Sequence, residues 1–284
     1  MPNITFHCKV ISPLFLGGAY NEQAELRPPS IKGALRFWAR AVAKHWIWEE
    51  EKENHKQLLQ FDEELFGGVK MHQSRSMVSV EVRHGSPDVI KGGGLNKSGQ
   101  GLKYLLYSLV VHNQDKEGFK AEFPFDVTLR SKDQTALNKA IAAFWALTYF
   151  GALGTRARRG GGAFEVVSCE GFELPQGISF WPGNNLATFL KDGLQAASKI
   201  FVVPPKARSP QGYSTLGQKI WVSKKMHRDW DSALEEIGRL MFNYRQPKRP
   251  DPRYSDEEPR FTQQTLNQKA AFGLPISVFH TANT

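Results

Sequence analysis

The stretch GALGTRARRGGGAFEVV (residues 151–167) joins a long apolar segment to a short run of β-type residues. Glycine permits positive φ angles and close approach of a partner, and arginine presents forked donors that fit phosphate oxygens. The stretch therefore predicts a loop on which an anionic polymer lies against the main chain. A solvated connection whose charges serve only solubility is the alternative. The residues that carry the pattern are Arg156, Arg158, Arg159, Gly160, Gly161 and Gly162.

The composition indicates a globular protein with a basic surface that suits an anionic partner. With 284 residues, the chain is long enough for one or two domains, and 19 Phe and 7 Trp can build a sizeable core. The net charge of +9 favours nucleic acid or an anionic membrane as partner. The N-terminus opens in strand-like alternation and no 18-residue apolar run occurs, so we expect a cytoplasmic protein that binds nucleic acid. Cys8 and Cys169 form neither a disulfide framework nor a zinc pattern, and no cofactor is expected.

Hydrophobic periodicity predicts alternating strands and helices through residue 173. The predicted strands are 3–11, 76–83, 121–129 and 164–168, and the predicted helices are 30–48 and 134–150. Their order, βαββαβ, is typical of a ferredoxin-like α+β domain with insertions. Within the insertions we expect a helix over 49–64, a glycine-rich loop over 91–101, and either a strand or a helix over 102–111.

The helix expected over residues 30–48 offers a second candidate phosphate site. A serine is expected to cap it, and basic residues recur every four positions on one side. No carboxylate within the helix stands at the spacing that would neutralise them, and the first turn already favours an anion. A solvated helix face is the alternative. The residues concerned are Ser30, Lys32, Gly33, Arg36, Arg40 and Lys44.

Residues 174–284 predict a second region. Helices are expected over 186–197 and 229–244, and strands over 219–225 and 275–279. Four prolines and dense charge predict a mobile segment over 245–260. The strand at 275–279 either pairs back onto the first sheet or begins a domain that the chain does not complete.

Five motifs together resemble the RAMP superfamily of CRISPR proteins, and within it the first RAMP subunit of the type III-B (Cmr) effector complex. Each motif is moderately specific alone, and their order and spacing make the resemblance strong over residues 4–170. The motifs are VISPLFLGG (10–18), LRPPSIKGALRFWAR (26–40), LFGG (65–68), GTRARRGGGAF (154–164) and FGLPI (272–276).

The resemblance implies two tandem ferredoxin-like, RRM-related domains, at 1–173 and 174–284. It also implies a binding subunit without catalytic residues, which holds CRISPR RNA and target RNA among other subunits of the Cmr complex. The family's backbone-binding helix start corresponds to Ser30, Lys32, Gly33 and Arg36, and its glycine-rich loop to residues 156–162. Ala163-Phe164 departs from the family's usual alternation of glycine with a bulky residue.

Two rival functions remain open. A metal-independent endoribonuclease needs a general base and a cation over the developing phosphorane, and His7 or His45 with Lys44 or Arg156 are the candidates. The carboxylates at 62–64 are interpreted as helix-surface charge rather than metal ligands. A scaffold that contacts only protein is the other rival.

Aromatic residues near the loops offer a further possibility for RNA binding. Phe15, Phe37 and Phe164 are candidates for stacking on unpaired bases. Core packing is the alternative for each of them.

Overall fold

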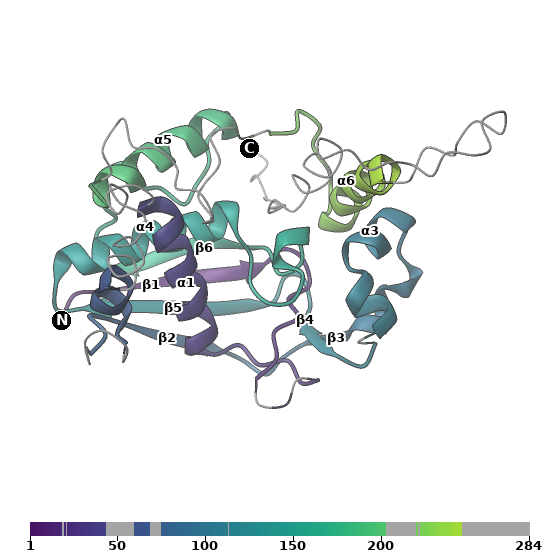
Figure 1. Ribbon diagram of the computed structural model, residues 1–284, viewed down its shortest axis with the longest axis horizontal. Helices are drawn as coiled ribbons and strands as arrows, with labels where there is room; N and C mark the ends of the chain where they lie inside the picture. Colours follow the sequence, from purple (N-terminus) through teal and green to yellow (C-terminus); the bar gives the residue numbers. More distant parts are fainter. Residues whose placement is uncertain are drawn as a thin grey trace, which may run out of the picture.

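A four-stranded antiparallel sheet forms the centre of the computed structural model, which describes residues 1–18, 20, 22–43, 60–68, 75–112, 114–202, 220 and 222–245 (Figure 1). Its strands are β1 (Asn3–Val10), β2 (Val78–His84), β5 (Pro124–Ser131) and β6 (Phe164–Gly171), in the order β2-β5-β1-β6. Helix α1 (Pro28–Ala43) follows β1, and helix α4 (Gln134–Phe150) follows β5. This topology confirms the predicted βαββαβ arrangement.

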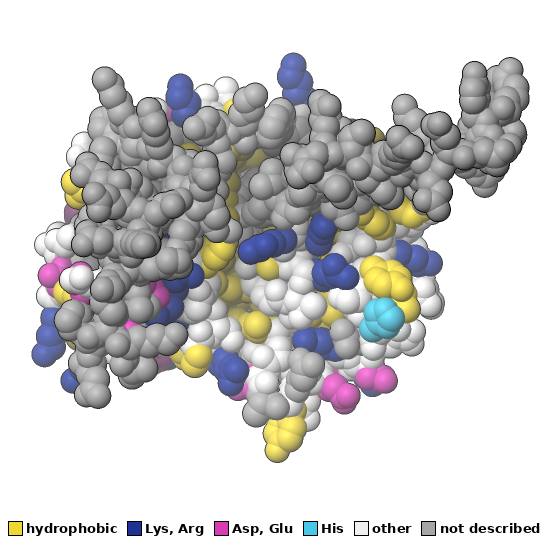
Figure 2. Space-filling view, in the orientation of Figure 1, with side chains coloured by type: hydrophobic (Ala, Val, Ile, Leu, Met, Phe, Trp, Pro, Cys, Tyr) yellow, Lys and Arg dark blue, Asp and Glu magenta, His cyan; other side chains and the backbone are white. Residues whose placement is uncertain are grey.

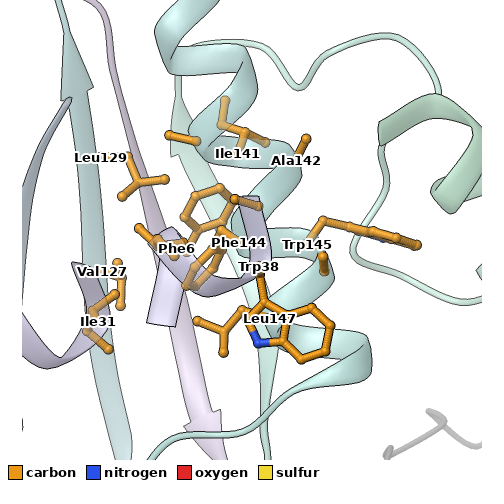
Figure 3. Close-up of a cluster of buried hydrophobic side chains, with 14 of the residues drawn as sticks. Phe6, Ile31, Trp38, Val127, Leu129, Ile141, Ala142, Phe144, Trp145 and Leu147 are labelled. Atoms are coloured by element: carbon orange, nitrogen blue, oxygen red, sulfur yellow. The ribbon is translucent and has the colours of Figure 1, made fainter. Parts of the chain in front are cut away.

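Alternation along the strands places the core on one face of the sheet, under α1 and α4. On β1, Ile4 and Phe6 are fully buried, whereas Thr5 and His7 point to the other face and stay partly exposed. Figure 3 shows Phe6 between the sheet and α4, where its ring centroid lies 4.6 Å from that of Phe144. The strands therefore present a polar outer face opposite the helices.

The helix boundaries follow from their capping residues. Asp133 accepts the N–H of Ala136 at 2.7 Å and fixes the start of α4 at the predicted residue. Helix α1 begins at Pro28, two residues before the predicted start, because proline is well tolerated in a first helical turn. Ser30 is thus a first-turn residue, and its assignment as the helix cap is wrong.

The insertion between β2 and β5 is more regular than predicted. Strands β3 (Val89–Lys91) and β4 (Glu117–Phe119) pair, and between them lie η1 (Gly92–Lys97), α3 (Gln100–Leu105) and η2 (Ser108–His112). Most of segment 91–101 lies in η1 and α3, so the prediction of a loop there is wrong. Segment 102–111 is mainly helical.

Helix α6 (Trp230–Arg245) explains why the short helix α3 forms. The two helices lie side by side (Figure 1), and the Glu235 carboxylate accepts the N–H groups of Gly101 and Leu102 at 3.2 and 2.9 Å. Together they enclose a second apolar cluster that includes Leu102, Leu105 and Leu234. Tertiary packing thus stabilises a helix that is too short to persist alone.

Beyond β6, the regular elements among the described residues are helices. Helix α5 (Leu186–Ile200) begins where Asn185 accepts the N–H of Thr188, and it packs on α4. The strand predicted over 219–225 is wrong for its described residues, 220 and 222–225, which are not in a strand. The segments 245–260 and 275–279 lie almost wholly outside the described residues, so a second ferredoxin-like domain stays a prediction. Among the described helices, none is long and apolar enough to cross a membrane.

The contact between α3 and α6 predicts that Gly101→Ala destabilises the fold. The added Cβ would overlap the Glu235 carbonyl oxygen and lie 2.6 Å from the Arg239 nitrogen, so the two backbones must separate. We expect a loss of about 1–3 kcal/mol in the free energy of unfolding, measured by urea denaturation. Gly85→Ala is the control, because its Cβ would meet nothing within 4 Å. Equal stabilities of the two variants would contradict the helix packing.

Candidate nucleic-acid interface

The segment after β1 holds the arginine loop, residues 151–163, in place. Gly162 donates its N–H to the Pro13 carbonyl at 3.0 Å, and Thr155 donates to the Phe15 carbonyl at 2.7 Å. The buried Ser12 hydroxyl donates to the Gly160 carbonyl at 2.6 Å and accepts the Ala163 N–H at 2.9 Å. Sequence reasoning missed Ser12. The only signal was its place in VISPLFLGG, beside the loop motif in the resemblance.

The three consecutive glycines serve the fold. Gly160, Gly161 and Gly162 are buried, and the first and last adopt φ angles of +80° and +74°. A Cβ on Gly162 would overlap the Leu153 carbonyl oxygen, and one on Gly160 would overlap a Leu234 methyl group. Glycine is therefore required by backbone geometry and close packing. Because these glycines are buried, the expectation that RNA lies against their main chain gains no support from their packing and stays a prediction.

The loop's arginines, by contrast, reach two neighbouring elements. Arg158 is exposed, and its guanidinium lies 5.8 Å from the centre of the Phe37 ring on α1. Arg156 adopts a left-handed conformation (φ 65°), and its Nε donates to the Ser108 hydroxyl at 2.8 Å. The fold thus joins the arginine loop to α1 on one side and to η2 on the other.

The basic stripe on α1 is largely neutralised by a neighbouring segment. Arg36 lies 2.8 Å from one oxygen of Asp62, and Arg40 lies 3.2 Å from the other. Arg36 also donates to the carbonyls of Phe66, at 2.9 Å, and Gly67. The prediction of an unpaired basic face is wrong because the carboxylate arrives from residues 60–66. Asp62 and Glu63 are buried, so their interpretation as surface charge is wrong as well.

The predicted residues at the start of α1 differ in their exposure. Lys32 donates to the Ser76 hydroxyl at 2.8 Å. Partial burial lowers the pKa of Lys32, and the positive charge of Arg36 lowers it further. Gly33 is exposed, and a Cβ there would meet nothing within 4 Å. Ser30 is half-buried in the same turn.

Gly33, Phe37 and Arg158 form one continuous surface, which we name the α1–loop surface. Gly33 and Phe37 are four residues apart and share a face of α1, on which Arg158 rests. Figure 2 shows Lys and Arg side chains both across the middle of this view and along its margins, whereas Asp and Glu side chains lie towards the margins. Of the predicted stacking residues, Phe37 is half-buried, whereas Phe15 and Phe164 are core residues.

The outer face of the sheet carries paired charges. The His7 Nδ1 lies 2.8 Å from Asp126, and its Nε2 lies 3.8 Å from Glu170. Lys9 lies 3.0 Å from Glu122 and 3.1 Å from Glu165. The nearest charged partners of the His7 ring are thus carboxylates, whereas a nuclease base needs a cation over the phosphate.

Of the other residues of the nuclease hypothesis, Arg156 donates its Nε to the Ser108 hydroxyl. His45 and Lys44 lie outside the described residues. Within the described ranges, no group of three His, Cys, Asp or Glu is arranged to hold a metal ion.

Comparison with known proteins assigns this architecture to a family. The model of the RAMP superfamily matches residues 7–165, more than half of the chain, so the chain belongs to this superfamily. It is homologous to Cmr1 subunits of CRISPR systems, as the resemblance predicted. The chain is 27% identical to subunit Cmr1-2 of Pyrococcus furiosus over 57% of this chain and 93% of that one. It is 30% identical to subunit Cmr1-1 of the same organism over 51% of this chain and 42% of that one.

Solved structures share the fold. The crystal structure of apo Cmr1 from Pyrococcus furiosus matches 100% of this chain and 80% of its own, with a TM-score of 0.66 and 21% identity. A chain of the type III-B Cmr-β complex bound to cognate target RNA matches 84% of this chain and 73% of its own, with a TM-score of 0.53 and 14% identity. These likenesses support a mixed α+β fold of the Cmr1 type.

The Asp62 cluster predicts a structural role for Arg36 and Arg40. Asp62→Ala would leave two arginines without their buried carboxylate. We expect the free energy of unfolding to fall by about 2–3 kcal/mol. This is less than the cost of breaking a fully buried ion pair, because both arginines are partly exposed. The control is Glu64→Ala, because Glu64 is exposed and its hydrogen bond among the described residues is the one it accepts from Gln60 at 2.7 Å. Chemical denaturation of both variants measures the effect, and an Asp62→Ala variant as stable as the control would refute it.

Proposed function

We propose that the chain is an RNA-binding subunit of a type III-B Cmr ribonucleoprotein, which grips the backbone of the CRISPR RNA, the target RNA or both. The observation that carries the proposal is the α1–loop surface, where Arg158 meets Phe37 beside the open Gly33. Homology to Cmr1 subunits supports it, as do structural neighbours within complexes bound to target RNA.

The chemistry of the surface suits a backbone more than base edges. In RNA-guided complexes, base pairing reads the sequence and the protein holds the phosphates and the shape. Guanidinium groups fit phosphate oxygens, and the net charge of +9 attracts a polyanion. Arg156, Arg158, Arg159 and Lys32 are the proposed phosphate-binding residues. Arg36 and Arg40 act indirectly, because Asp62 occupies their guanidinium groups.

Gly33 supports a close approach of RNA to α1. Glycine within a helix costs roughly 0.5–1 kcal/mol relative to alanine. At most glycines of the arginine loop a clash or a positive φ explains the residue, but at Gly33 neither is present. A ligand that must come within contact distance of the helix backbone accounts for the missing side chain.

As a subunit, the chain is proposed to contact other Cmr subunits and to bind without cleaving. Residues 174–284 are proposed to belong to the second of two tandem domains, of which α5 and α6 are the described part. A protein-only scaffold is the main competing function. A scaffold has no need of the exposed cation Arg158 on the α1–loop surface, so the salt dependence of binding separates the two functions.

Arg158→Ala is expected to weaken RNA binding and reduce its salt dependence. For a single strand, the slope of log K against log salt changes by about 0.7 for each phosphate that the protein no longer neutralises. Fluorescence anisotropy of a labelled single-stranded RNA over a KCl series measures the slope. Arg83→Ala is the matched control. Arg83 lies on the edge strand β2, outside the α1–loop surface, and its guanidinium pairs with Glu81. A wild-type protein without a salt slope would support the scaffold instead.

Gly33→Ala separates stability from binding. We expect the free energy of unfolding to rise by roughly 0.5–1 kcal/mol, because alanine favours the helix and its Cβ meets open space. RNA affinity should fall by roughly tenfold, the decrease expected when one hydrogen bond to a charged group is removed. Thermal unfolding and anisotropy measure the two quantities. A variant that is more stable and binds RNA as well as the wild type would rule out close approach at this position.

A further inference from the structure

A second feature adjoins the arginine loop, on the side away from α1. An open pocket of about 530 Å³ lies where the loop meets α3 and α6. Its volume falls in the range of sites for small organic groups. It shares Arg156 and Arg159 with the loop, so a strand held by these arginines passes its rim.

The pocket is lined by aromatic rings from two helical segments. Tyr104 belongs to α3, and its ring centroid lies 5.6 Å from that of Phe242 on α6, at an interplanar angle of 74°. Tyr107 follows α3 and is 49% exposed, although a ring of this size is usually better buried. The ring of Tyr107 also makes an edge contact with His112, with centroids 5.3 Å apart. An exposed ring held from one side leaves a face for a planar ligand.

The remaining lining residues are cationic or amide. Lys103, Arg156 and Arg159 supply positive charge, and Gln100 supplies both a donor and an acceptor. The seven described lining residues include no carboxylate. Rings for stacking, cations for phosphate and an amide for a base edge are the groups that bind single-stranded nucleic acid.

Arg156 is held in an unusual conformation towards this pocket. Its φ angle of 65° is rare for a residue with a side chain, and such strain often occurs where a side chain must be aimed. The Arg156 Nε donates to the Ser108 hydroxyl at 2.8 Å, and the two terminal guanidinium nitrogens take no part in that bond. Gly160, at the other end of the turn, contacts Leu234 of α6 and thereby ties the loop to the same helix pair.

We propose that this pocket holds one unpaired RNA base, stacked on Tyr107 and Tyr104, with its phosphate on Arg156 and Arg159. The inference rests on the proposed RNA-binding function and extends it from backbone contact to a base-stacking site. An unpaired nucleotide beside a guide–target duplex has its faces free, whereas a paired base does not. The site therefore distinguishes a single-stranded segment from a duplex without reading its sequence.

The test compares a fluorescent 12-nucleotide RNA with an abasic strand of equal length and charge, using the full chain. We expect the wild type to bind the base-bearing strand more tightly. Tyr107→Ala should lower its affinity by about 5- to 150-fold, the range for loss of one stacked base, and should leave abasic binding unchanged. Tyr107→Phe keeps the ring and should retain the affinity. Tyr20→Ala is the control, because Tyr20 is 74% exposed and lies outside the pocket.

The outcomes separate the two proposals. If Tyr107→Ala behaves like Tyr20→Ala while salt-dependent binding persists, the stacking site is overturned and the RNA-binding function stands. If the wild type binds neither strand, both proposals are overturned. If a nucleoside monophosphate alone saturates the pocket and displaces no RNA, the pocket is a mononucleotide site and the assignment to RNA is wrong. Circular dichroism of each variant verifies that the fold is retained.

Discussion

The pairing of β1 with β6 is the constraint on which the candidate site depends. Val10 pairs with Phe164 in antiparallel strands. The segment just after Val10 must therefore lie beside the segment just before Phe164, although about 150 residues separate them in sequence. The buried Ser12 hydroxyl then joins the Gly160 carbonyl to the Ala163 N–H, so the turn between the arginines and β6 has one conformation. Each of these buried polar groups is paired, which makes any other arrangement costly. The loop's arginines are thereby placed beside α1, where the Arg158 guanidinium lies over the Phe37 ring.

The arginines of α1 and of the arginine loop look alike in the sequence but have two different environments in the structure. Arg36 and Arg40 surround a buried carboxylate and hold residues 60–66 against α1. Arg158 stays exposed, with its guanidinium over the face of Phe37. Spacing along a helix reveals whether cations share a face, but not whether a carboxylate from another segment meets them. That information belongs to tertiary packing, which is why the stripe was misinterpreted.

Hydrophobic periodicity predicts the main strands and helices of the fold, but it does not predict the surface between them. Helix α4 and strand β1 are predictable because their apolar spacing matches a long, well-packed element. Helix α3 is not, since it has six residues and depends on Glu235, 133 positions beyond Leu102. The pocket residues Tyr104 and Tyr107 fell in a segment that fitted either a strand or a helix. The sequence shows that the arginine loop is rich in glycine. The reason, positive φ angles and close packing, is visible only in the structure.

The location of the cations also distinguishes this domain from an RRM, which stacks bases on aromatic residues of its sheet. Here the outward positions of β1 carry Thr5, His7 and Lys9, and the last two contact carboxylates of neighbouring strands. A polyanion on that face would have to displace those carboxylates from their partners and accept repulsion from them. At Arg158 on the α1–loop surface this cost is smaller, because its guanidinium lies over the Phe37 ring rather than against an acid. Under the proposed function, therefore, the same βαββαβ frame receives RNA on its helix side, where loops rather than strands supply the contacts.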